Sequence, residues 1–477
     1  MVPHLYCPVN LDIDAVVAKF PFPLREGLKK DYLRFIVHSV ITRRASLSDE
    51  HLKRLGKDNG FVPLNSIILK EKIPQYQIHL DYLEQADIIQ CDNTYIVGKV
   101  SKGYKLTDLY LGQPVILVPV ADFILRQKII RDDPFKKSNK AFIEFPYLSK
   151  WFRTKMLTID EHAAIKYINK LEIVEFNNID SNRLFSKQRK LEEKASIFEK
   201  YKNFKVLVSR FANQDFFFKI DDAGNRLHTN LTNLPKGLRK HVTYEGKKLV
   251  SIDIVNSQPY MSIGLLQKEF WQTHTNTEKP TLKEIHKGKY KETRKERKII
   301  NSIIMFLDSP ESLYSRGFEK ENFIKNVING DFYEFLITVF ENELGLKLGG
   351  TQEEKRRKVK GKVLTLLFDN DNKGYNQEPD SPSQLFRKKF PMISRIFRYI
   401  KKNDYRMLAI ILQRIESSLL LGKVCKRISK ESPDIPLFTI HDSIVTTKGN
   451  ESYIESVMKN ELEKSLGNSP TLKIEDW

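Results

Sequence analysis

Two short apolar segments that each carry one aspartate constrain this chain most. Residues 251–258 contain Asp253, and residues 438–444 contain Asp442. The apolar run before Asp253 predicts a β-strand that ends at this residue, and the run around Asp442 predicts a β-hairpin with this aspartate near its turn. A half-buried carboxylate without a neighbouring Lys or Arg favours a bound cation. Two such carboxylates on adjacent strands suit a pair of Mg²⁺ ions, an arrangement used in phosphoryl transfer.

Each aspartate alone has a simpler explanation. Asp253 lies shortly before a predicted helix over residues 260–270, and Asp and Asn are common helix N-caps. A His-Asp pair such as His441-Asp442 is frequent by chance. The two segments therefore indicate a metal site only when they are considered together with the sequence between them.

A basic helix is predicted between the two aspartates, over residues 353–368. Lys360 follows Arg356 by four residues and Phe368 follows Lys360 by eight, so a helix places all three on one face. Two cations followed by an aromatic ring could hold a triphosphate and stack on a base. The simpler alternative is a basic surface helix with an apolar second half.

The composition favours a nucleic-acid partner. The chain has 477 residues, with 80 Lys and Arg against 60 Asp and Glu, and its net charge is +20. Clustered cations bind phosphate backbones because binding releases counterions. Cys7, Cys91 and Cys425 are far apart and have no metal-ligand spacing, which predicts a reduced compartment. The amino terminus lacks a signal-peptide pattern, and no apolar stretch reaches the roughly 18 residues of a membrane helix. We therefore expect a cytoplasmic protein that does not bind membranes.

The first 200 residues divide into three predicted segments. Residues 1–58 read as helices and loops, and residues 111–200 read as a helical, thumb-like connector. Within the connector, the charged run 186–194 is either a solvated helix face or a helix that grips a duplex backbone. Residues 59–110 combine two short helices, a polar turn and a basic hairpin. This order resembles a winged-helix module, whose second helix and wing contact DNA; the alternative is a structural or protein-binding subdomain.

The two aspartate segments and the basic helix, in this order, resemble motifs A, B and C of the family A DNA polymerases. They also resemble the motifs of the related single-subunit RNA polymerases of phages and mitochondria. Motif B of these families is an Arg, a Lys four residues later and an aromatic residue eight beyond the Lys, as in Arg356, Lys360 and Phe368. Motif C is His-Asp followed by Glu in the DNA enzymes or Ser in the RNA enzymes, and Ser443 follows the latter.

Three further blocks resemble the same families. Residues 224–235 are similar to the Thr-Gly-Arg-Leu…Asn-Leu…Asn-Ile-Pro block before motif A. Residues 386–391 are similar to the Phe…Tyr-Pro segment after motif B, and residues 412–417 fall where the families have a Gln-bearing helix that supports the primer terminus. For residues 201–477 the resemblance implies an α+β right-hand polymerase with an antiparallel palm sheet and helical fingers and thumb.

The resemblance also implies the role of each site residue. Two Mg²⁺ ions, for which Mn²⁺ can substitute, would be held by the carboxylates of Asp253 and Asp442 and the backbone carbonyl of Ile254. Lys360 would act on the leaving pyrophosphate and Arg356 on the triphosphate, with Phe368 beside the nascent base pair and Gln258 beside the sugar. The residues implied to contact primer or template are Arg226, Gln413 and His441.

Departures from the family pattern bear on the substrate. The fifth residue after Asp253 is Gln258, where the DNA enzymes have Glu and the RNA enzymes have Gly. A long side chain here would crowd a ribose 2′-OH, and Phe368 lacks the hydroxyl with which the RNA enzymes recognise ribose. Ser443, in contrast, favours the RNA enzymes. Asp369 stands where motif B usually has Gly, so the family pattern does not predict the conformation of the turn after the basic helix.

We therefore expect a DNA-directed DNA polymerase that extends a primer with dNTPs, without an evident 3′–5′ exonuclease pattern. One alternative is an RNA polymerase or primase on the same palm. A second is a non-catalytic DNA-binding replication protein with a decayed palm. The basic runs 236–248, 287–298 and 355–362 could line a duplex channel. Frequent Lys, Asn and Ile point to an AT-rich genome, such as a bacterial mobile element or a virus.

Overall fold

The computed structural model describes eleven stretches of the chain. They are residues 3–20, 27–57, 59–96, 100–131, 135, 139–182, 184–272, 279–286, 293–309, 311–370 and 381–477, with the backbone alone at 311–317 and 382–383. Three sequence features lie partly outside these residues: the predicted basic hairpin at 97–99, the basic run 287–298 at 287–292, and the segment 369–384, whose Asn, Asp, Gly, Pro and Ser residues predict a loop, at 371–380. No described helix is both long and apolar enough to cross a membrane.

The chain folds into two compact units. Unit 1 comprises Met1–Asn139, Leu157–Phe217 and Thr229–Val242, and unit 2 comprises Lys140–Met156, Phe218–His228 and Thr243–Trp477. Neither unit is one continuous stretch of sequence. The four consecutive domains that we expected, 1–58, 59–110, 111–200 and 201–477, stay a prediction.

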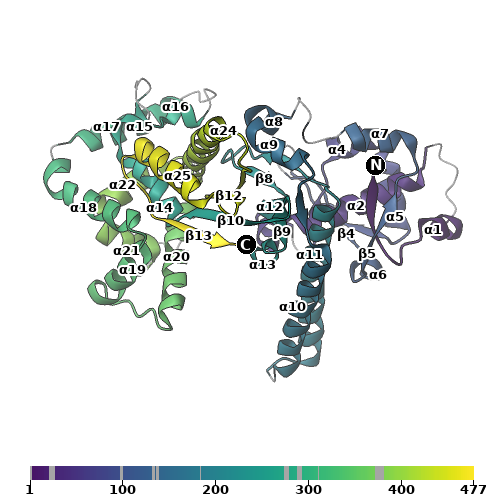
Figure 1. Cartoon of the computed structure of the whole chain (residues 1–477). Coiled ribbons are helices and arrows are strands. Elements are labelled where there is room, and N and C mark those ends of the chain that lie inside the picture. Colours follow the sequence, from purple (N-terminus) through teal and green to yellow (C-terminus); the bar gives the residue numbers. More distant parts are fainter. Residues whose placement is uncertain are drawn as a thin grey trace. The chain divides into compact units, whose positions relative to one another are not determined.

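Unit 1 begins with a two-stranded antiparallel sheet against a long helix (Figure 1). Strand β1 (His4–Pro8) pairs with β5 (Val115–Pro119), and helix α2 (Lys30–Ser46) packs against β1. Helix α2 buries Leu33, Ile36 and Val37 completely. Their spacing of three and four residues defines the apolar stripe that a helix needs to face a core. The neighbouring short helices are α1 (Ile13–Lys19), α3 (Asp49–Arg54), α6 (Asp108–Leu111) and α7 (Phe123–Arg131).

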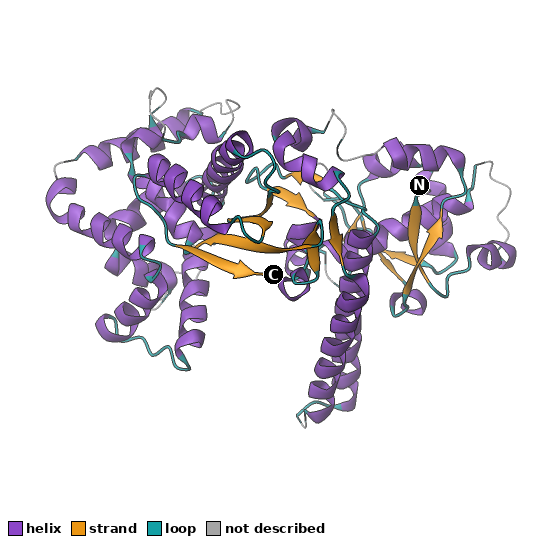
Figure 2. Cartoon of the chain, in the orientation of Figure 1, coloured by secondary structure: helices purple, strands orange, loops and turns teal. Residues whose placement is uncertain are grey.

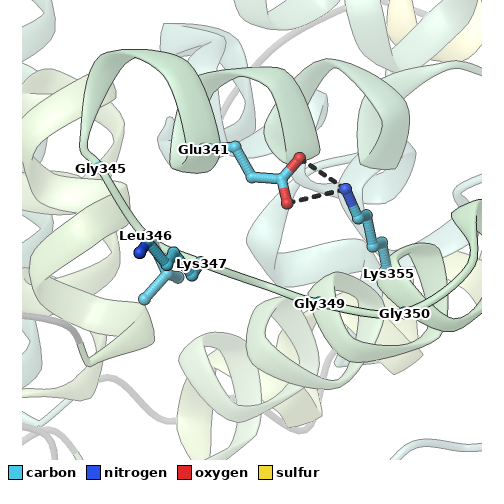
Figure 3. Close-up of a pocket in the computed structure, with 7 residues that line it drawn as sticks. All are labelled: Glu341, Gly345, Leu346, Lys347, Gly349, Gly350 and Lys355. Carbon is cyan, nitrogen blue, oxygen red and sulfur yellow. Dashed lines mark hydrogen bonds and ion pairs between the residues drawn. The ribbon is translucent and has the colours of Figure 1, made fainter.

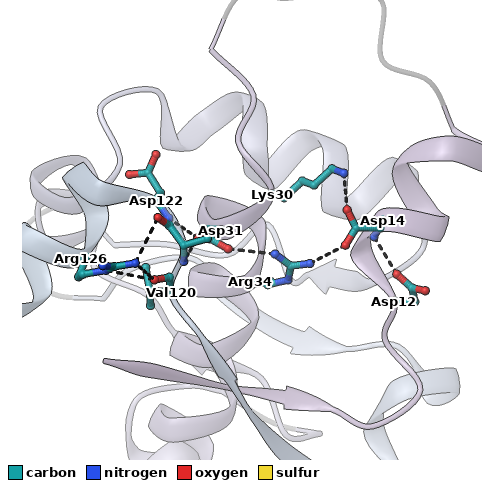
Figure 4. Close-up of polar contacts among 9 residues, drawn as sticks. Asp12, Asp14, Lys30, Asp31, Arg34, Val120, Asp122 and Arg126 are labelled. Carbon is teal, nitrogen blue, oxygen red and sulfur yellow. Dashed lines mark hydrogen bonds and ion pairs between the residues drawn. The ribbon is translucent and has the colours of Figure 1, made fainter. Parts of the chain in front are cut away.

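A buried aspartate fixes the turn that leads into α7 (Figure 4). Asp31 accepts hydrogen bonds from the backbone N–H groups of Ala121 and Asp122, both at 2.6 Å, and from the Arg34 guanidinium at 2.9 Å. Arg34 also pairs with Asp14 at 2.9 Å. Both carboxylate oxygens of Asp31 thus accept hydrogen bonds within the fold, so Asp31 has a structural role.

The region predicted as a winged helix contains two helices and a three-stranded antiparallel sheet. Its elements are β2 (Val62–Pro63), α4 (Ser66–Lys72), α5 (Tyr76–Gln85), β3 (Ile89–Cys91) and β4 (Gly103–Leu106), with strand order β2-β4-β3. A helix was predicted to begin at Pro63, but Pro63 lies in β2 and the first helix of this region begins at Ser66. The exposed side chains of α5, all described, are Gln77, Asp81, Glu84 and Gln85. This face lacks the cations that phosphate contacts need, and DNA binding by this module stays a prediction.

A long helical hairpin completes unit 1 (Figure 1). It consists of α10 (Glu161–Ser181) and α11 (Lys187–Ala212). The charged run 186–194 forms the start of α11, where Ser186 is the N-cap. Several α11 lysines pair with acids of α10, among them Lys194 with Asp180 at 2.7 Å. Such exposed pairs fit a solvated face, and a grip on duplex DNA stays a prediction. The other elements of this unit are β6 (Leu157–Ile159), α12 (Asn230–Asn233) and α13 (Lys236–Arg239).

An antiparallel sheet forms the centre of unit 2 (Figure 2). Its central strand is β10 (Lys247–Ile254), which pairs with β12 (Ser443–Thr447) and with β13 (Leu472–Asp476). Strand β11 (Phe438–Ile440) extends the sheet beyond β12, and β9 (Val242–Tyr244) forms a hairpin with the start of β10. The expected antiparallel sheet that carries both aspartate segments is confirmed.

Helices surround this sheet. The described segments from 293 to 309 and from 311 to 401 form a helical layer with a core of phenylalanines, in which the ring centroids of Phe386 and Phe390 lie 5.1 Å apart and those of Phe323 and Phe390 5.4 Å apart. Its elements are α17 (Arg294–Asp308), α18 (Glu311–Ile328), α19 (Phe332–Thr338), the π-helical η2 (Val339–Glu343), α20 (Gln352–Phe368), α21 (Pro382–Lys389) and α22 (Pro391–Lys401). These are the helices expected to act as fingers, a role that stays a prediction.

The remaining elements of unit 2 include the helix predicted over residues 260–270, which is not continuous. It consists of α14 (Ser257–Ser262), the 3₁₀-helix η1 (Ile263–Leu266) and α15 (Lys268–Trp271). Asn256 precedes α14 with φ of 58°, a left-handed conformation that Asn tolerates. The others are α8 (Lys140–Glu144), α9 (Pro146–Arg153), β7 (Phe218–Ile220), β8 (Leu227–Thr229), α16 (Leu282–Ile285), α23 (Met407–Ser417), η4 (Ser418–Cys425), α24 (Lys426–Glu431) and α25 (Glu451–Leu466).

Candidate active site

Asp253 and Asp442 lie on adjoining segments of the unit 2 sheet. Asp253 is opposite Ser443 in the β10–β12 register, and the Ser443 hydroxyl donates to Oδ1 of Asp253. The Ser251 hydroxyl donates to Oδ2 of Asp253 at 2.9 Å. The Ile254 N–H donates to the backbone carbonyl of Asp442 at 3.4 Å. The strand pairing therefore brings together two carboxylates that are 189 residues apart in the sequence.

Electrostatics link Asp442 to three other site residues. Burial raises the pKa of the Asp442 carboxyl, and the negative charge of Asp253 raises it further. The positive charges of Arg226 and Lys360 act in the opposite direction on the same pKa. Charges that shift a pKa in this way lie close to the group they act on. Asp253, Arg226 and Lys360 therefore lie near enough to Asp442 for their charges to influence its pKa.

His441 and Asp442 form the two-residue turn of the β11–β12 hairpin, which confirms the predicted hairpin. His441 has φ of 52°, a left-handed conformation that is unfavourable for most residues with a side chain. Its ring lies 6.0 Å from that of His228 in an edge-on arrangement. His228 in turn forms a 2.9 Å hydrogen bond with Asp221. Strained residues of this kind gather at functional sites.

Helix α20 confirms the predicted basic helix and presents Lys360 on its exposed surface. Arg356 pairs through Nε with Oε1 of Glu334 and lies 5.3 Å from the ring centre of Tyr333. Phe368 is the last residue of the helix and is half-buried. In this structure Arg356 therefore already has an anionic partner, which a triphosphate would have to displace.

A buried lysine, Lys401, stabilises the turn after α20. Asp369 is the C-cap in an extended conformation, so the missing glycine is not needed for a left-handed residue here. The Lys401 ammonium donates to the carbonyls of Leu366 and Asp369, the latter at 2.8 Å. A cation at a helix C-terminus satisfies carbonyls that the helix leaves without partners.

The predicted Gln-bearing helix is α23, and the β7–β8 turn docks against it. Arg414 donates to the carbonyls of Ala223 at 2.7 Å and Asp222 at 3.2 Å, and Ser417 donates to that of Gly224 at 3.1 Å. A Cβ atom on Gly224 would lie 2.9 Å from Cβ of Gln413, closer than such atoms can approach and not relieved by moving the end of the side chain. Glycine is therefore required where this turn meets Gln413.

A buried glutamate of α23 joins two site residues that the sequence assigned to different roles. Glu416 is 1% exposed. Its Oε1 accepts from Arg226 through Nε at 2.8 Å and Nη2 at 2.6 Å. Its Oε2 accepts from Nε2 of Gln258 at 2.6 Å and from the Ser257 hydroxyl at 3.1 Å. Burial raises the pKa of Glu416 to about 7, whereas the charge of Arg226 lowers it.

Sequence reasoning gave no role to Glu416, and it also missed Lys473. Glu416 follows the buried Ile415 within an apolar helix, and a Glu at such a position is a detectable signal. Lys473 is opposite Asp253 in the β10–β13 register, so both side chains lie on the same face of the sheet. A hydrogen bond from the Lys473 ammonium to the Glu475 carboxylate and the charge of Asp253 raise the pKa of Lys473. Nothing in the sequence predicted this pairing.

The donor set fits a divalent cation that also binds phosphate. Within the described residues, no group of three or more His, Cys, Asp and Glu side chains could hold a metal ion. Mg²⁺ does not need such a cage, because it binds through one or two carboxylates plus substrate phosphates. Burial and, to a smaller extent, the negative charge of Asp253 raise the pKa of Asp442, and a bound cation would offset both effects.

A surface depression lies at the start of α20 and does not include either aspartate (Figure 3). It is lined by the loop around Gly345, Gly349 and Gly350 and by Glu341 and Lys355. Lys355 pairs with Glu341 at 2.9 Å. The charge of Lys355 is therefore already neutralised, whereas Lys347, which also lines the depression, is exposed.

Comparisons with known proteins add one likeness of fold. No family model matches the chain, and no curated protein matches it. Among solved structures, the chain is similar to the POL domain of Pol1 from M. smegmatis, in complex with DNA primer-template and dNTP. The TM-score is 0.44 and the sequence identity 12%, over 74% of this chain and 72% of that one. A likeness of this degree assigns no activity, so any proposal rests on the residues of the site.

Proposed function

We propose that the chain is a template-directed nucleotidyltransferase, and specifically a DNA-directed DNA polymerase that extends a primer. The observation that supports this best is the pairing of β10 with β12, which brings Asp253 beside the Asp442 hairpin. Arg226 and Lys360 act on the same carboxylate. Two carboxylates with cations around them suit the transfer of a charged phosphoryl group. Its partners would be a DNA template, a primer and nucleoside triphosphates in the cytoplasm.

The proposed metal ligands are the carboxylates of Asp253 and Asp442 and the backbone carbonyl of Ile254. Bound Mg²⁺, or Mn²⁺ in its place, would promote ionisation of the primer 3′-OH and neutralise charge on the triphosphate. The Ser251 and Ser443 hydroxyls hold the Asp253 carboxylate in one orientation. Orientation of this kind reduces the reorganisation that ligand binding requires.

The other side chains bind and orient the substrates. Lys360 would donate a proton or a hydrogen bond to the leaving pyrophosphate, and Arg356 would hold the triphosphate. Phe368, at the end of the same helix, would pack beside the nascent base pair. The residues proposed to contact primer or template are Arg226, Gln413 and His441.

The ion pair between Arg356 and Glu334 leads to a prediction about nucleotide affinity. We expect Glu334→Gln to lower the Kd for dNTP by a factor of about 2 to 5, because it frees Arg356 from a partly exposed pair worth about 1 kcal/mol or less. Titration of dNTP into the protein with bound primer-template measures this. Glu353→Gln, an exposed glutamate of the same helix, is the matched control. An unchanged or higher Kd in Glu334→Gln contradicts the phosphate role of Arg356.

The side chain of Gln258 leads to a prediction about the sugar. We expect Gln258→Gly to raise the ratio of ribonucleotide to deoxyribonucleotide incorporation about tenfold or more, because it removes the group that would crowd a 2′-OH. Single-nucleotide incorporation with matched dNTP and rNTP measures the ratio. If the ratio stays the same while dNTP incorporation is retained, Gln258 has no part in sugar selection.

A single-subunit RNA polymerase or primase is the second candidate, and Ser443 after Asp442 is the residue that favours it. Extension of primed and unprimed templates with dNTPs and with NTPs separates the two candidates. Synthesis with NTPs on unprimed template would replace the proposal by this alternative. A non-catalytic DNA-binding protein is disfavoured by the strand pairing of the two aspartate segments and by the charges of Arg226 and Lys360, which act on Asp442.

A further inference from the structure

The contacts of Glu416 connect two parts of the site that the sequence keeps far apart. One oxygen of its carboxylate binds the Arg226 guanidinium through two N–H groups, and the other binds Gln258 and Ser257. Arg226 belongs to the β7–β8 turn, and Gln258 to α14 directly after the Asp253 strand. One buried side chain therefore fixes both residues at once.

The tether determines how Gln258 is presented. Its Nε2 points to Glu416 at 2.6 Å, and its Oε1 is buried with no hydrogen-bond partner among the described residues. The amide is thus turned into the protein. Any substrate would meet the rest of the side chain, whose position depends on the bond to Glu416.

We infer that Glu416 is a positioning residue that couples sugar selection by Gln258 to primer contact by Arg226. The inference rests on the proposed function and names the group that sets the sugar preference of the same site. Glu416 contacts no reacting atom in this account. Its effect passes through the two side chains that it holds.

The negative charge of Glu416 is essential to this arrangement. Glu416 is the acceptor in all four of these hydrogen bonds: two come from Arg226, one from Ser257 and one from Gln258. A glutamine at 416 would keep the size but replace one acceptor oxygen by an NH₂ group. That group would face either the guanidinium, where a donor would meet a donor, or the Gln258 amide, which would then have to turn over to offer its Oε1.

A purely structural role is the alternative. Buried ion pairs often contribute little to stability and are retained for other reasons. A structural role predicts that substitution lowers the melting temperature and leaves the sugar preference of the folded protein unchanged. The coupling role predicts a change in sugar preference even where the protein stays folded.

The test compares Glu416→Gln and Gln258→Met with the wild type, in full-length protein on primer-template with Mg²⁺ at about pH 8, above the pKa of Glu416. Methionine has nearly the length of glutamine but cannot bond to Glu416. We expect each variant to raise the rNTP/dNTP incorporation ratio about tenfold, the effect of one hydrogen bond to a charged group. We expect only Glu416→Gln also to raise the KM for primer-template, because only it disturbs Arg226. Glu463→Gln, on the exposed side of α25, is the matched control.

The double variant completes the cycle. If Glu416 acts on the sugar through Gln258, adding Glu416→Gln to Gln258→Met raises the ratio no further. An unchanged ratio in Gln258→Met overturns the inference, because side-chain bulk alone then excludes the 2′-OH. This variant also decides the matter if Glu416→Gln does not fold. A wild type that incorporates no nucleotide refutes the proposed function itself, and the inference falls with it.

Discussion

Asp253→Asn and Asp442→Asn are each expected to reduce nucleotide incorporation about 10³-fold or more. Each substitution keeps the shape of the side chain but removes the charge that would hold a divalent cation. Metal ions contribute several kcal/mol to phosphoryl transfer, and each 1.36 kcal/mol corresponds to a factor of about ten in rate. Single-turnover extension of a labelled primer by one nucleotide measures the loss.

The same variants should still bind DNA. Anisotropy of a labelled primer-template is expected to give a Kd close to that of the wild type. Neither substitution changes Arg226 or the basic runs 236–248, 287–298 and 355–362. Asp434→Asn is the matched control, since Asp434 is exposed in the loop before β11. Substantial synthesis by either site variant would mean that the aspartate pair is not the catalytic centre.

Lys360→Ala is expected to lower kcat about 10²- to 10³-fold with a smaller change in the Kd for dNTP. A positioned general acid contributes about 10² to 10⁴ in rate, and the effect appears in kcat because the leaving group gains charge only in the transition state. Pre-steady-state incorporation over a range of dNTP concentrations separates the two constants.

Lys362→Ala is the control for this substitution. Lys362 lies two residues further along α20, which places it about 200° around the helix from Lys360. It should leave both constants near their wild-type values. A Lys360→Ala variant that changes only dNTP affinity would make Lys360 a binding residue and leave the protonation step to another group.

The parts of the fold that were predicted correctly depend on local patterns. The strand before Asp253, the hairpin around Asp442 and the helix over 353–368 each follow from apolar runs, turn residues or four-residue spacing within one segment. β10 and α20 match these predictions within a few residues. The helix predicted over residues 260–270 was wrong as a continuous element, because the tighter 3₁₀-helix η1 interrupts it at Ile263–Leu266.

The parts that could not be predicted depend on contacts between distant segments. The tether from Gln258 to Glu416 spans 158 residues, and the β10–β13 pairing places Lys473 beside Asp253 across 220 residues. No local pattern carries such a contact. The exposed face of α5 is a different case. Its acidic residues Asp81 and Glu84 could be identified from the sequence, and they argue against DNA contact by that helix.

The turn after α20 shows how a departure from a family pattern is accommodated. Glycine is common after a helix because it adopts a left-handed conformation without strain. Here Asp369 stays extended, and Lys401 from α22 binds the carbonyls at the end of α20. The compensation comes from a residue 32 positions later, so the sequence near Asp369 gave no sign of it.

The most direct measurement is incorporation of one labelled nucleotide by the wild-type protein on a primed DNA template, with and without Mg²⁺. The account predicts that the complementary dNTP is added to the primer, that the other three are not, and that a chelator stops the reaction. Absence of incorporation with every nucleotide and with either Mg²⁺ or Mn²⁺, from protein that binds the primer-template, would contradict it.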